Sequence, residues 1–93
     1  MKGNTLNEFI DSLYINCDKE LIYKGRKIMV EGWFNPKDST YTLRAFECCE
    51  DYPELFLRTD SDRTACVTAF EEAKIFNGLT IFEAENEIEV LYG

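Results

Sequence analysis

The fold is decided by residues 27–49, KIMVEGWFNPKDSTYTLRAFECC, because two alternating segments in this stretch flank a turn. From Lys27 to Asn35 the side chains divide into two sets with a period of two, and the same period returns from Thr40 to Cys49. Successive residues of a strand point to opposite faces of a sheet, so this period indicates two strands. Between them, Asn35–Ser39 combines proline with side chains that hydrogen-bond locally, which is typical of a turn. The stretch therefore predicts an antiparallel pair.

Three further strands are expected around this pair. Glu20–Lys24 precedes it, and Lys24-Gly25-Arg26 supplies the turn. Glu54–Thr59 follows it after a break at Glu50–Pro53, and Glu87–Tyr92 forms the last strand. Short connections between consecutive strands predict an antiparallel meander.

The first helix and a later helical turn are marked by capping boxes. Thr5-Leu6-Asn7-Glu8 is followed by apolar residues at positions 6, 9, 10 and 13, which form one face of a helix that ends at Asn16–Asp18. Thr80-Ile81-Phe82-Glu83 has the same capping pattern, which predicts a single short helical turn through about Asn86.

The second main helix is expected after acidic capping residues. Asp60, Ser61 and Asp62 offer N-cap oxygens, and apolar residues at positions 66, 69, 70, 73 and 76 follow at helical spacing. Asn77-Gly78 is expected to close this helix, with Gly78 in the left-handed conformation. The predicted order is therefore α-β-β-β-β-α-(short α)-β.

This order predicts an α+β fold, with a four- to five-stranded antiparallel sheet and two main helices packed on one face. We expect residues 1–93 to form a single globular domain, because the chain is too short for a second core. The face predicted to be buried carries Ile28, Val30, Phe34, Tyr41, Leu43, Ala45, Leu55, Leu57, Ile88 and Val90. The opposite face is predicted to carry Glu31, Trp33, Thr42, Arg44, Phe46, Phe56, Arg58 and Glu89.

Charge is distributed unevenly along the chain. Residues 1–46 hold seven Lys/Arg and six Asp/Glu, a net of +1, whereas residues 47–93 hold three and twelve, a net of −9, so the total is −8. Such a field repels nucleic acid and anionic membrane, and attracts basic surfaces within a Debye length of roughly 8–10 Å. The start of the chain lacks the apolar core of a signal peptide, and no apolar run approaches the roughly 20 residues of a membrane span. We therefore expect a cytoplasmic protein without direct nucleic-acid or membrane binding.

No residue pattern indicates catalysis or a cofactor. The chain lacks histidine, its carboxylates fall mostly in turns, at helix starts and at alternating strand positions, and its glycines are isolated. General acid–base chemistry needs a group with a perturbed pKa in a cleft, and phosphate-bearing cofactors need a glycine-rich loop. We therefore expect no enzymatic activity, no catalytic residues and no cofactor.

The four cysteines, Cys17, Cys48, Cys49 and Cys66, are expected to be reduced thiols in a cytosol. None is spaced as Cys-x-x-Cys, and without histidine a zinc site would have to combine sulfurs or carboxylates from distant segments. Strand alternation would send the sulfurs of Cys48 and Cys49 to opposite faces. We expect small buried hydrophobic residues and no metal site.

Two surfaces are candidates for binding a partner. An apolar cluster rimmed by charge on the exposed sheet face would be typical of a contact surface, although ordinary cross-strand pairing explains it equally well. The acidic surface of the second half would suit a basic partner, although solubility explains it more simply. The candidate residues are Glu31, Trp33, Arg44, Phe46, Phe56, Arg58, Glu47, Glu50, Asp51, Glu54, Glu83, Glu85, Glu87 and Glu89.

Three segments carry a resemblance. With Glu31-Gly32-Trp33, residues 73–85 (AKIFNGLTIFEAE) and Glu87-Ile88-Glu89, the chain resembles small uncharacterised proteins of Gram-positive bacteria, some of them carried on conjugative elements. The shared motifs are a helix stop, a capping box and a strand. The resemblance implies a bacterial cytosolic accessory protein and assigns no activity.

Three functions remain open from the sequence. The leading hypothesis is a non-enzymatic binding module that engages a protein partner through its acidic surface, its aromatic sheet face, or both. The first alternative is an acidic DNA mimic that inhibits a nucleic-acid-binding protein. The second is a small cysteine-based redox or metal protein. Capture of a partner by a DNA mimic should weaken steeply with salt, which separates the first two functions.

Overall fold

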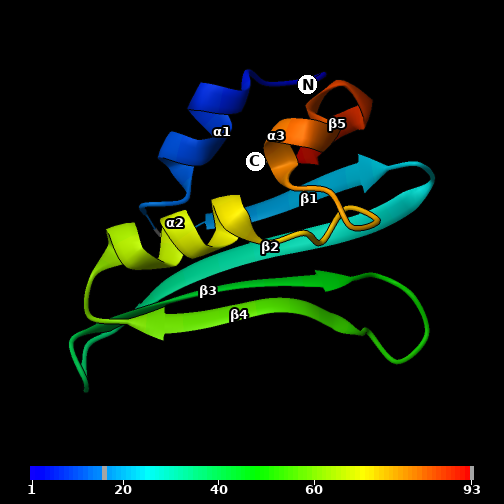
Figure 1. Ribbon diagram of the computed structural model, residues 1–93. Coiled ribbons are helices and arrows are strands. Elements are labelled where there is room, and N and C mark those ends of the chain that lie inside the picture. Colours follow the sequence, from blue (N-terminus) through cyan, green and yellow to red (C-terminus); the bar gives the residue numbers. More distant parts are fainter. Residues whose placement is uncertain (16, 93) are drawn as a thin grey trace.

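The computed structural model describes residues 1–15 and 17–92 and confirms the α+β prediction (Figure 1). Within these residues an antiparallel sheet is combined with short helices, none of which is long and apolar enough to cross a membrane. The elements are α1 (Leu6–Ser12), β1 (Cys17–Tyr23), β2 (Arg26–Asn35), β3 (Thr40–Glu47), β4 (Glu54–Asp60), α2 (Arg63–Glu72), α3 (Ile81–Ala84), the 3₁₀ turn η1 (Glu85–Glu87) and β5 (Ile88–Tyr92).

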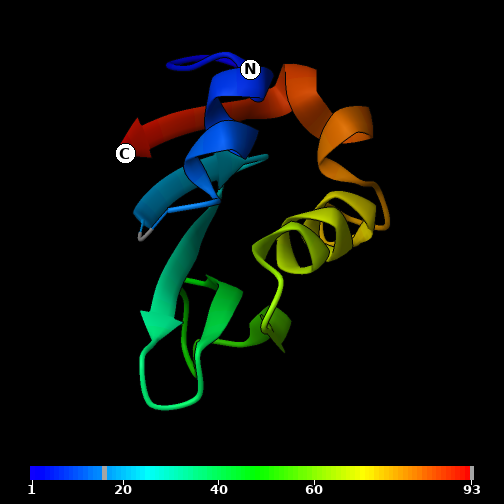
Figure 2. The same ribbon diagram turned by 90° about the vertical axis from the view of Figure 1, so that its left-hand side faces the viewer.

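The sheet has the strand order β4-β3-β2-β1-β5, and all neighbouring strands are antiparallel. The first four strands form the expected meander, whereas β5 returns to pair with β1 at the far edge. The chain between β4 and β5 passes over one face of the sheet, so α2 and α3 lie on the same side as α1 (Figures 1 and 2). The other face has no helix over it in the described part of the chain.

The core lies between this sheet and the helices. Its sixteen buried hydrophobic residues are at most 2% exposed, and eight of them come from strands. They confirm the predicted burial of six strand residues: Ile28, Val30, Tyr41, Leu43, Ala45 and Ile88. Val90 is partly buried against the same cluster. Phe34 is an exception, because it lies near the end of β2 and is 41% exposed, with the Arg63 guanidinium 5.6 Å from its ring centroid.

The β1–β2 hairpin turns through Lys24 and Gly25, whose φ values of 47° and 78° place both in the left-handed region. This is the conformation that matches the twist of two hairpin strands. β1 begins at Cys17, three residues before the predicted start, because its pairing with β2 continues as far as Gly32. The predicted helix end at Asn16–Asp18 is therefore wrong for Cys17 and Asp18, while Asn16 lies outside the described residues.

The face assignment of β4 was wrong from Phe56 onward, and a β-bulge is the reason, whereas Leu55, predicted to be buried, is partly buried against the core. The β3–β4 register shifts so that Phe46 pairs with Glu54 but Ala45 pairs with Phe56, which leaves Leu55 as an extra residue. An extra residue inverts the side on which every later side chain of that strand lies. Phe56 therefore points toward the helices instead of away from them.

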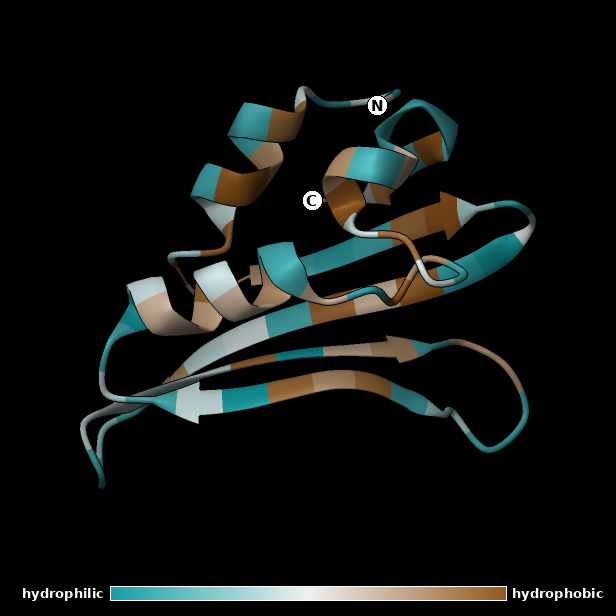
Figure 3. Cartoon of the chain, in the orientation of Figure 1, coloured by the Kyte–Doolittle hydropathy of each residue, from teal (hydrophilic) through white to brown (hydrophobic). Residues whose placement is uncertain are grey.

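The same inversion moves two more residues of β4. Leu57, predicted to be buried, pairs with Arg44 on the uncovered side and is 53% exposed. Arg58, predicted on that uncovered side, pairs with Leu43 and lies on the helix side. Figure 3 shows the middle of β4 as one continuous apolar stretch, in which no alternation is visible.

The second helix ends earlier than its apolar spacing predicts. α2 stops at Glu72, and Ala73 is already extended, with ψ at 132°. Phe76 and Leu79 exchange two backbone hydrogen bonds of 3.1 and 3.0 Å around Asn77 and Gly78. Both central residues have positive φ, 55° and 83°. Asn-Gly therefore forms a two-residue reversal of the hairpin type. The left-handed conformation of Gly78 was predicted correctly, but its role as a helix cap was not.

The two capping boxes differ in completeness. At α3 the Thr80 N–H donates to Glu83 Oε1 (2.9 Å) and the Glu83 N–H donates to Thr80 Oγ1 (3.3 Å), as predicted. At α1 the Glu8 N–H donates to Thr5 Oγ1 (3.2 Å), but the Thr5 N–H bonds Asn4 Oδ1 instead (2.9 Å). The first box is therefore only half formed.

Candidate partner-binding surface

The uncovered side of the sheet, called here the open face, collects side chains from all five strands. The pairing registers and strand alternation place them side by side, because residues that pair directly across an antiparallel sheet share a face. The main members are Ile22, Met29, Glu31, Trp33, Thr42, Arg44, Phe46, Glu54, Leu57, Thr59 and Glu89.

Arg44 lies near the middle of the open face. It pairs with Glu31 on β2 and with Leu57 on β4. Its Nη1 lies 3.9 Å from Glu31 Oε1, and its Nε lies 3.3 Å from Glu54 Oε1. The guanidinium carbon stands 4.6 Å from the centroid of the Phe46 ring, in cation–π range. These half-exposed ion pairs contribute roughly 0–1 kcal/mol each, so they orient Arg44 more than they stabilise the fold.

A hydrogen-bonded chain orients Trp33 at one end of the open face. The Trp33 indole N–H donates to Asn35 Oδ1 at 3.0 Å, and the Asn35 amide donates to Thr42 Oγ1 at 2.9 Å. The Thr42 and Thr59 hydroxyl oxygens are 2.8 Å apart. Trp33 is 38% exposed, so its ring presents apolar surface while its polar atom is occupied. A side chain held in this way loses little entropy when it binds a partner.

The other end of the open face carries a second aromatic group. Phe46 pairs with Met29 across β2 and β3. Tyr52, from the β3–β4 connection, meets Phe46 edge-on with ring centroids 6.3 Å apart. Tyr52 is 63% exposed. Tyr52 and Leu57 were both missed from the sequence. Tyr52 falls in a predicted break before Pro53, and the side on which Leu57 lies depends on the bulge.

Most of the predicted acidic surface is occupied by intramolecular contacts. Glu47 Oε1 accepts from Arg26 Nε and Nη2 at 3.0 and 2.8 Å, and these hydrogen bonds lower the pKa of Glu47. The same arginine donates to Asn77 Oδ1 at 2.6 Å. Hydrogen bonds from the Thr80 N–H and hydroxyl lower the pKa of Glu83. Arg26 therefore links Glu47 to the Asn77–Gly78 turn, whereas Glu83 caps α3.

Two other acidic candidates are also paired. Glu87 lies 3.3 Å from Lys24 Nζ, and Glu85 lies 3.7 Å from the N-terminal ammonium group. Glu50 and Asp51 remain exposed in the β3–β4 connection. The structure therefore gathers only part of the predicted site on the open face: Glu31, Trp33, Arg44, Phe46, Glu54 and, at the β5 edge, Glu89.

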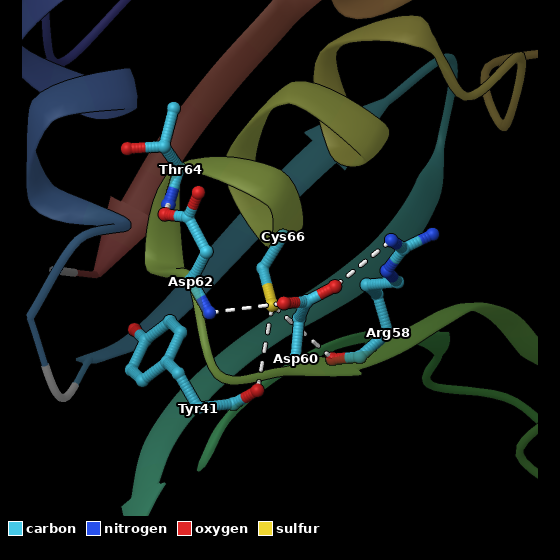
Figure 4. A network of polar contacts seen from close by, with 6 residues as sticks. All are labelled: Tyr41, Arg58, Asp60, Asp62, Thr64 and Cys66. Carbon is cyan, nitrogen blue, oxygen red and sulfur yellow. Dashed lines mark hydrogen bonds and ion pairs between the residues drawn. The ribbon is translucent and has the colours of Figure 1, made fainter. Parts of the chain in front are cut away.

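The junction of β4 and α2 holds the predicted residue Arg58 away from the open face (Figure 4). Arg58 Nη2 donates to Asp60 Oδ2 at 3.0 Å, and the Asp62 N–H donates to Asp60 Oδ1 at 2.9 Å. These hydrogen bonds lower the pKa of Asp60. Asp62 in turn accepts from the Thr64 N–H at 2.9 Å and caps α2. The network fixes the end of β4.

The environment of the four cysteines gives little support for a redox or metal-binding role. All four are free thiols. Burial raises the pKa of both Cys17 and Cys66, and burial and Glu47 raise the pKa of Cys49. A raised pKa disfavours the reactive thiolate. Cys48 and Cys49 lie beyond the end of β3, so the predicted separation by strand alternation does not apply to them. Within residues 1–15 and 17–92, no three potential ligand residues are grouped to hold a metal ion.

No family model matches the sequence, and neither a curated protein nor a solved structure is significantly similar to it. The features of the chain that point to a function are therefore the side chains of the open face and the strand at its edge.

Proposed function

We propose that this protein is a non-enzymatic binding module that engages a protein partner through its open face. One observation carries the proposal: no helix covers this face in the described residues, yet it displays oriented aromatic and aliphatic side chains around Arg44. Trp33, Leu57 and Tyr52 are each more than one-third exposed. Tryptophan, tyrosine and arginine dominate the binding energy of known interfaces.

The acidic surface is the weaker candidate for the same role. A mimic of duplex DNA needs carboxylates that are free to meet basic side chains, but Glu47, Glu83 and Glu87 are held by intramolecular partners. The net charge of −8 then acts mainly by steering basic partners toward the protein. From the resemblance, we also propose that the protein meets its partner in the bacterial cytosol.

The proposal is tested by affinity capture from a lysate of a Gram-positive bacterium, at low and at moderate salt. The wild type is compared with Trp33→Ala and with Phe82→Ala. Phe82 is a matched control, because it is an exposed aromatic residue on α3 rather than on the sheet. Thermal melts confirm that both variants are folded.

We expect a partner that survives moderate salt, is lost with Trp33→Ala and is retained with Phe82→Ala. A salt-sensitive partner that duplex DNA displaces and that ignores Trp33→Ala would instead favour the DNA mimic. Failure to capture any Trp33-dependent partner overturns the proposal.

A further inference from the structure

The two edge strands of the sheet, β5 and β4, differ in the backbone pairing on their outer sides. At β5 the N-terminal segment adds a short parallel bridge: the Lys2 N–H donates to Ile88 O at 3.0 Å, and the Val90 N–H donates to Lys2 O at 2.8 Å. At β4 no further strand pairs with the outer side, within residues 1–15 and 17–92. An uncovered edge strand presents unpaired backbone groups to another chain.

Two residues of β4 aim their backbone amides outward. In an antiparallel pair, hydrogen-bonded residue pairs alternate with pairs whose amides point away from each other and whose side chains lie closer together. Cys66 Sγ lies 3.4 Å from Tyr41 O and 3.7 Å from Arg58 O, so both carbonyls point into the space between β3 and β4, and the Thr42–Thr59 pair that they flank is one of the second kind. Leu57, two residues before Thr59, has the same orientation. Leu57 and Thr59 therefore each offer an N–H and a C=O at the edge.

The outer segment of β4 is regular enough to accept a strand. The bulge lies at Leu55, and from Phe56 to Asp60 the pairing with β3 continues without interruption. This segment contains no proline, and Pro53 precedes the strand. Bulges, prolines and short strands are the usual means of blocking an edge. None of them interrupts residues 56–60.

The negative charge of the segment that contains β4 indicates that a partner bound at this edge is basic. Residues 50–62 contain five carboxylates and one arginine, a net of −4, and the exposed Leu57 lies between the acidic ends. A second copy of this chain fits poorly. Each copy carries a charge of −8, and two-fold pairing centred on Leu57 would bring the two acidic segments 50–62 alongside each other. Like charges brought together in this way repel, which disfavours the pair.

We propose that β4 binds an extended, basic segment of a partner protein, which adds as a sixth strand through main-chain hydrogen bonds at Leu57 and Thr59. Strand addition draws its affinity from these main-chain bonds and its specificity from alternate side chains. Alternate apolar side chains of the added strand lie beside Leu57, and its basic side chains are attracted by the net negative charge of residues 50–62, in which Glu50 and Asp51 are exposed carboxylates outside the described ion pairs. This inference rests on the proposed function and specifies how the partner is held.

Backbone hydrogen exchange with a defined probe tests this inference. The probe is a short synthetic peptide of alternating lysine and valine. Its controls are the glutamate–valine counterpart and a lysine–valine peptide N-methylated on alternate backbone nitrogens. Because only the free fraction exchanges, exchange at Leu57 and Thr59 should slow about tenfold when nine-tenths of the protein is bound. The N-methylated and the acidic peptides should leave both rates unchanged.

Three results would overturn the inference. The first is unchanged exchange at Leu57 and Thr59 at saturating lysine–valine peptide. The second is equal slowing by the N-methylated peptide, which would show that side chains alone hold it. The third is slowing that depends on protein concentration without peptide and accompanies a dimer in sedimentation, which would identify a second copy as the occupant.

A matched pair of variants separates the backbone of Leu57 from its side chain. Leu57→Pro removes the outward N–H without touching the β3 ladder, and proline is tolerated on edge strands. Leu57→Ala keeps the N–H. We expect Leu57→Pro to abolish the protection of Thr59 by the peptide and Leu57→Ala to retain it. Equal protection in both variants overturns the inference. If Leu57→Pro does not fold, the N-methylated peptide decides the question.

The same pair distinguishes this inference from the proposed function. If a lysate partner depends on Trp33 but binds Leu57→Pro and Leu57→Ala equally, the strand-addition inference fails and the proposed function stands. If no partner depends on Trp33 while the peptide protects Leu57 and Thr59, the open-face proposal fails and the edge remains a peptide-binding strand.

Discussion

Phe56 of β4 packs edge-on against Phe70 of α2, with ring centroids 5.6 Å apart and ring planes at 85°. This contact exists because the bulge at Leu55 turns Phe56 toward the helices. It ties the edge strand to the helix that follows it. Its consequence is that adjacent apolar residues of β4 have different roles: Phe56 supports the fold, and Leu57 faces outward.

The stability of variants should follow this division. Phe56→Ala should lower the free energy of unfolding by about 2–3 kcal/mol, because it empties a site packed on α2. Leu57→Ala, which removes a half-exposed side chain, should cost about 0.5–1 kcal/mol. Urea titration of both variants measures the difference. Equal costs would show that the register shift is misplaced.

Gly32 on β2 has no room for a side chain. A Cβ on Gly32 would collide with the hydroxyl of Tyr41 and approach Cys17 Sγ at 3.3 Å. The Tyr41 hydroxyl lies 2.7 and 2.8 Å from the Leu13 and Ile15 carbonyl oxygens and donates its one proton between them. Gly32→Ala should therefore cost about 1–3 kcal/mol through overpacking and disturbed hydrogen bonds.

A double-mutant cycle checks this explanation of the Gly32 cost. Tyr41→Phe removes the hydroxyl that the new Cβ would meet, so Gly32→Ala should cost less in the Tyr41→Phe background than in the wild type. Chemical denaturation of the four proteins gives the coupling free energy. Additive costs would show that the strain lies in the backbone of Gly32 and not at Tyr41.

Gly78 should tolerate β-branched residues poorly. Its φ is 83°, although a Cβ on it would meet no other atom within 4 Å, so the cost arises from backbone conformation alone. Gly78→Val should cost roughly 1 kcal/mol or more, which corresponds to a fall of roughly 4–8 °C in melting temperature for a domain of this size. Gly78→Asn should cost less, because asparagine adopts the left-handed region more readily. Equal melting temperatures for the wild type and Gly78→Val would contradict the turn at Asn77–Gly78.

Cys49 should react slowly with alkylating reagents despite its exposure. Alkylation requires the thiolate, and partial desolvation of the thiol together with the neighbouring Glu47 carboxylate raises the pKa of Cys49 above that of an ordinary cysteine. Its alkylation rate should therefore reach half its maximum at a higher pH than that of a free cysteine peptide. Glu47→Gln removes the negative charge and should shift this midpoint to lower pH, whereas Glu50→Gln serves as the control. If the alkylation rate of Cys49 reached half its maximum at or below the pH found for the free cysteine peptide, the redox hypothesis would be favoured again.

Replacing Cys48 and Cys49 by serine should leave partner binding intact and change stability modestly. The two residues lie beyond the end of β3, in the connection to β4, and neither belongs to the buried core. Binding and melting temperature of the double variant check this expectation. Stoichiometric zinc in the purified protein, or a Cys48–Cys49 disulfide that persists in reductant, would contradict it.

Elements with strong local signals were predicted well. The second capping box forms as predicted because Thr80 and Glu83 satisfy each other's backbone donors within a single turn. The alternation of β2 and β3 predicted five buried residues correctly because polar residues interrupt the apolar ones in both strands. At α2 the spacing from Cys66 to Phe76 was misleading: the Asn77–Gly78 reversal buries Phe76 outside the helix.

The candidate site was recovered only in part. Glu31, Trp33, Arg44 and Phe46 lie on β2 and β3, where alternation is clear, and they meet on the open face as predicted. Phe56 and Arg58 were misplaced because Leu55-Phe56-Leu57 is apolar throughout, so alternation cannot assign its faces. Tyr52 joins Phe46 only through the folded β3–β4 connection.

The sequence by itself determined the number and order of the main elements, the N-capping residues of the helices and the left-handed conformation of Gly78. These features depend on interactions within a few residues, whose chemistry is visible in the chain. Only the tertiary structure decided the bulge at Leu55, the pairing of β5 with β1 and hence which edge stays open. Those choices depend on packing between segments far apart in the sequence, where burying Phe56 against Phe70 outweighs the cost of one disrupted ladder position.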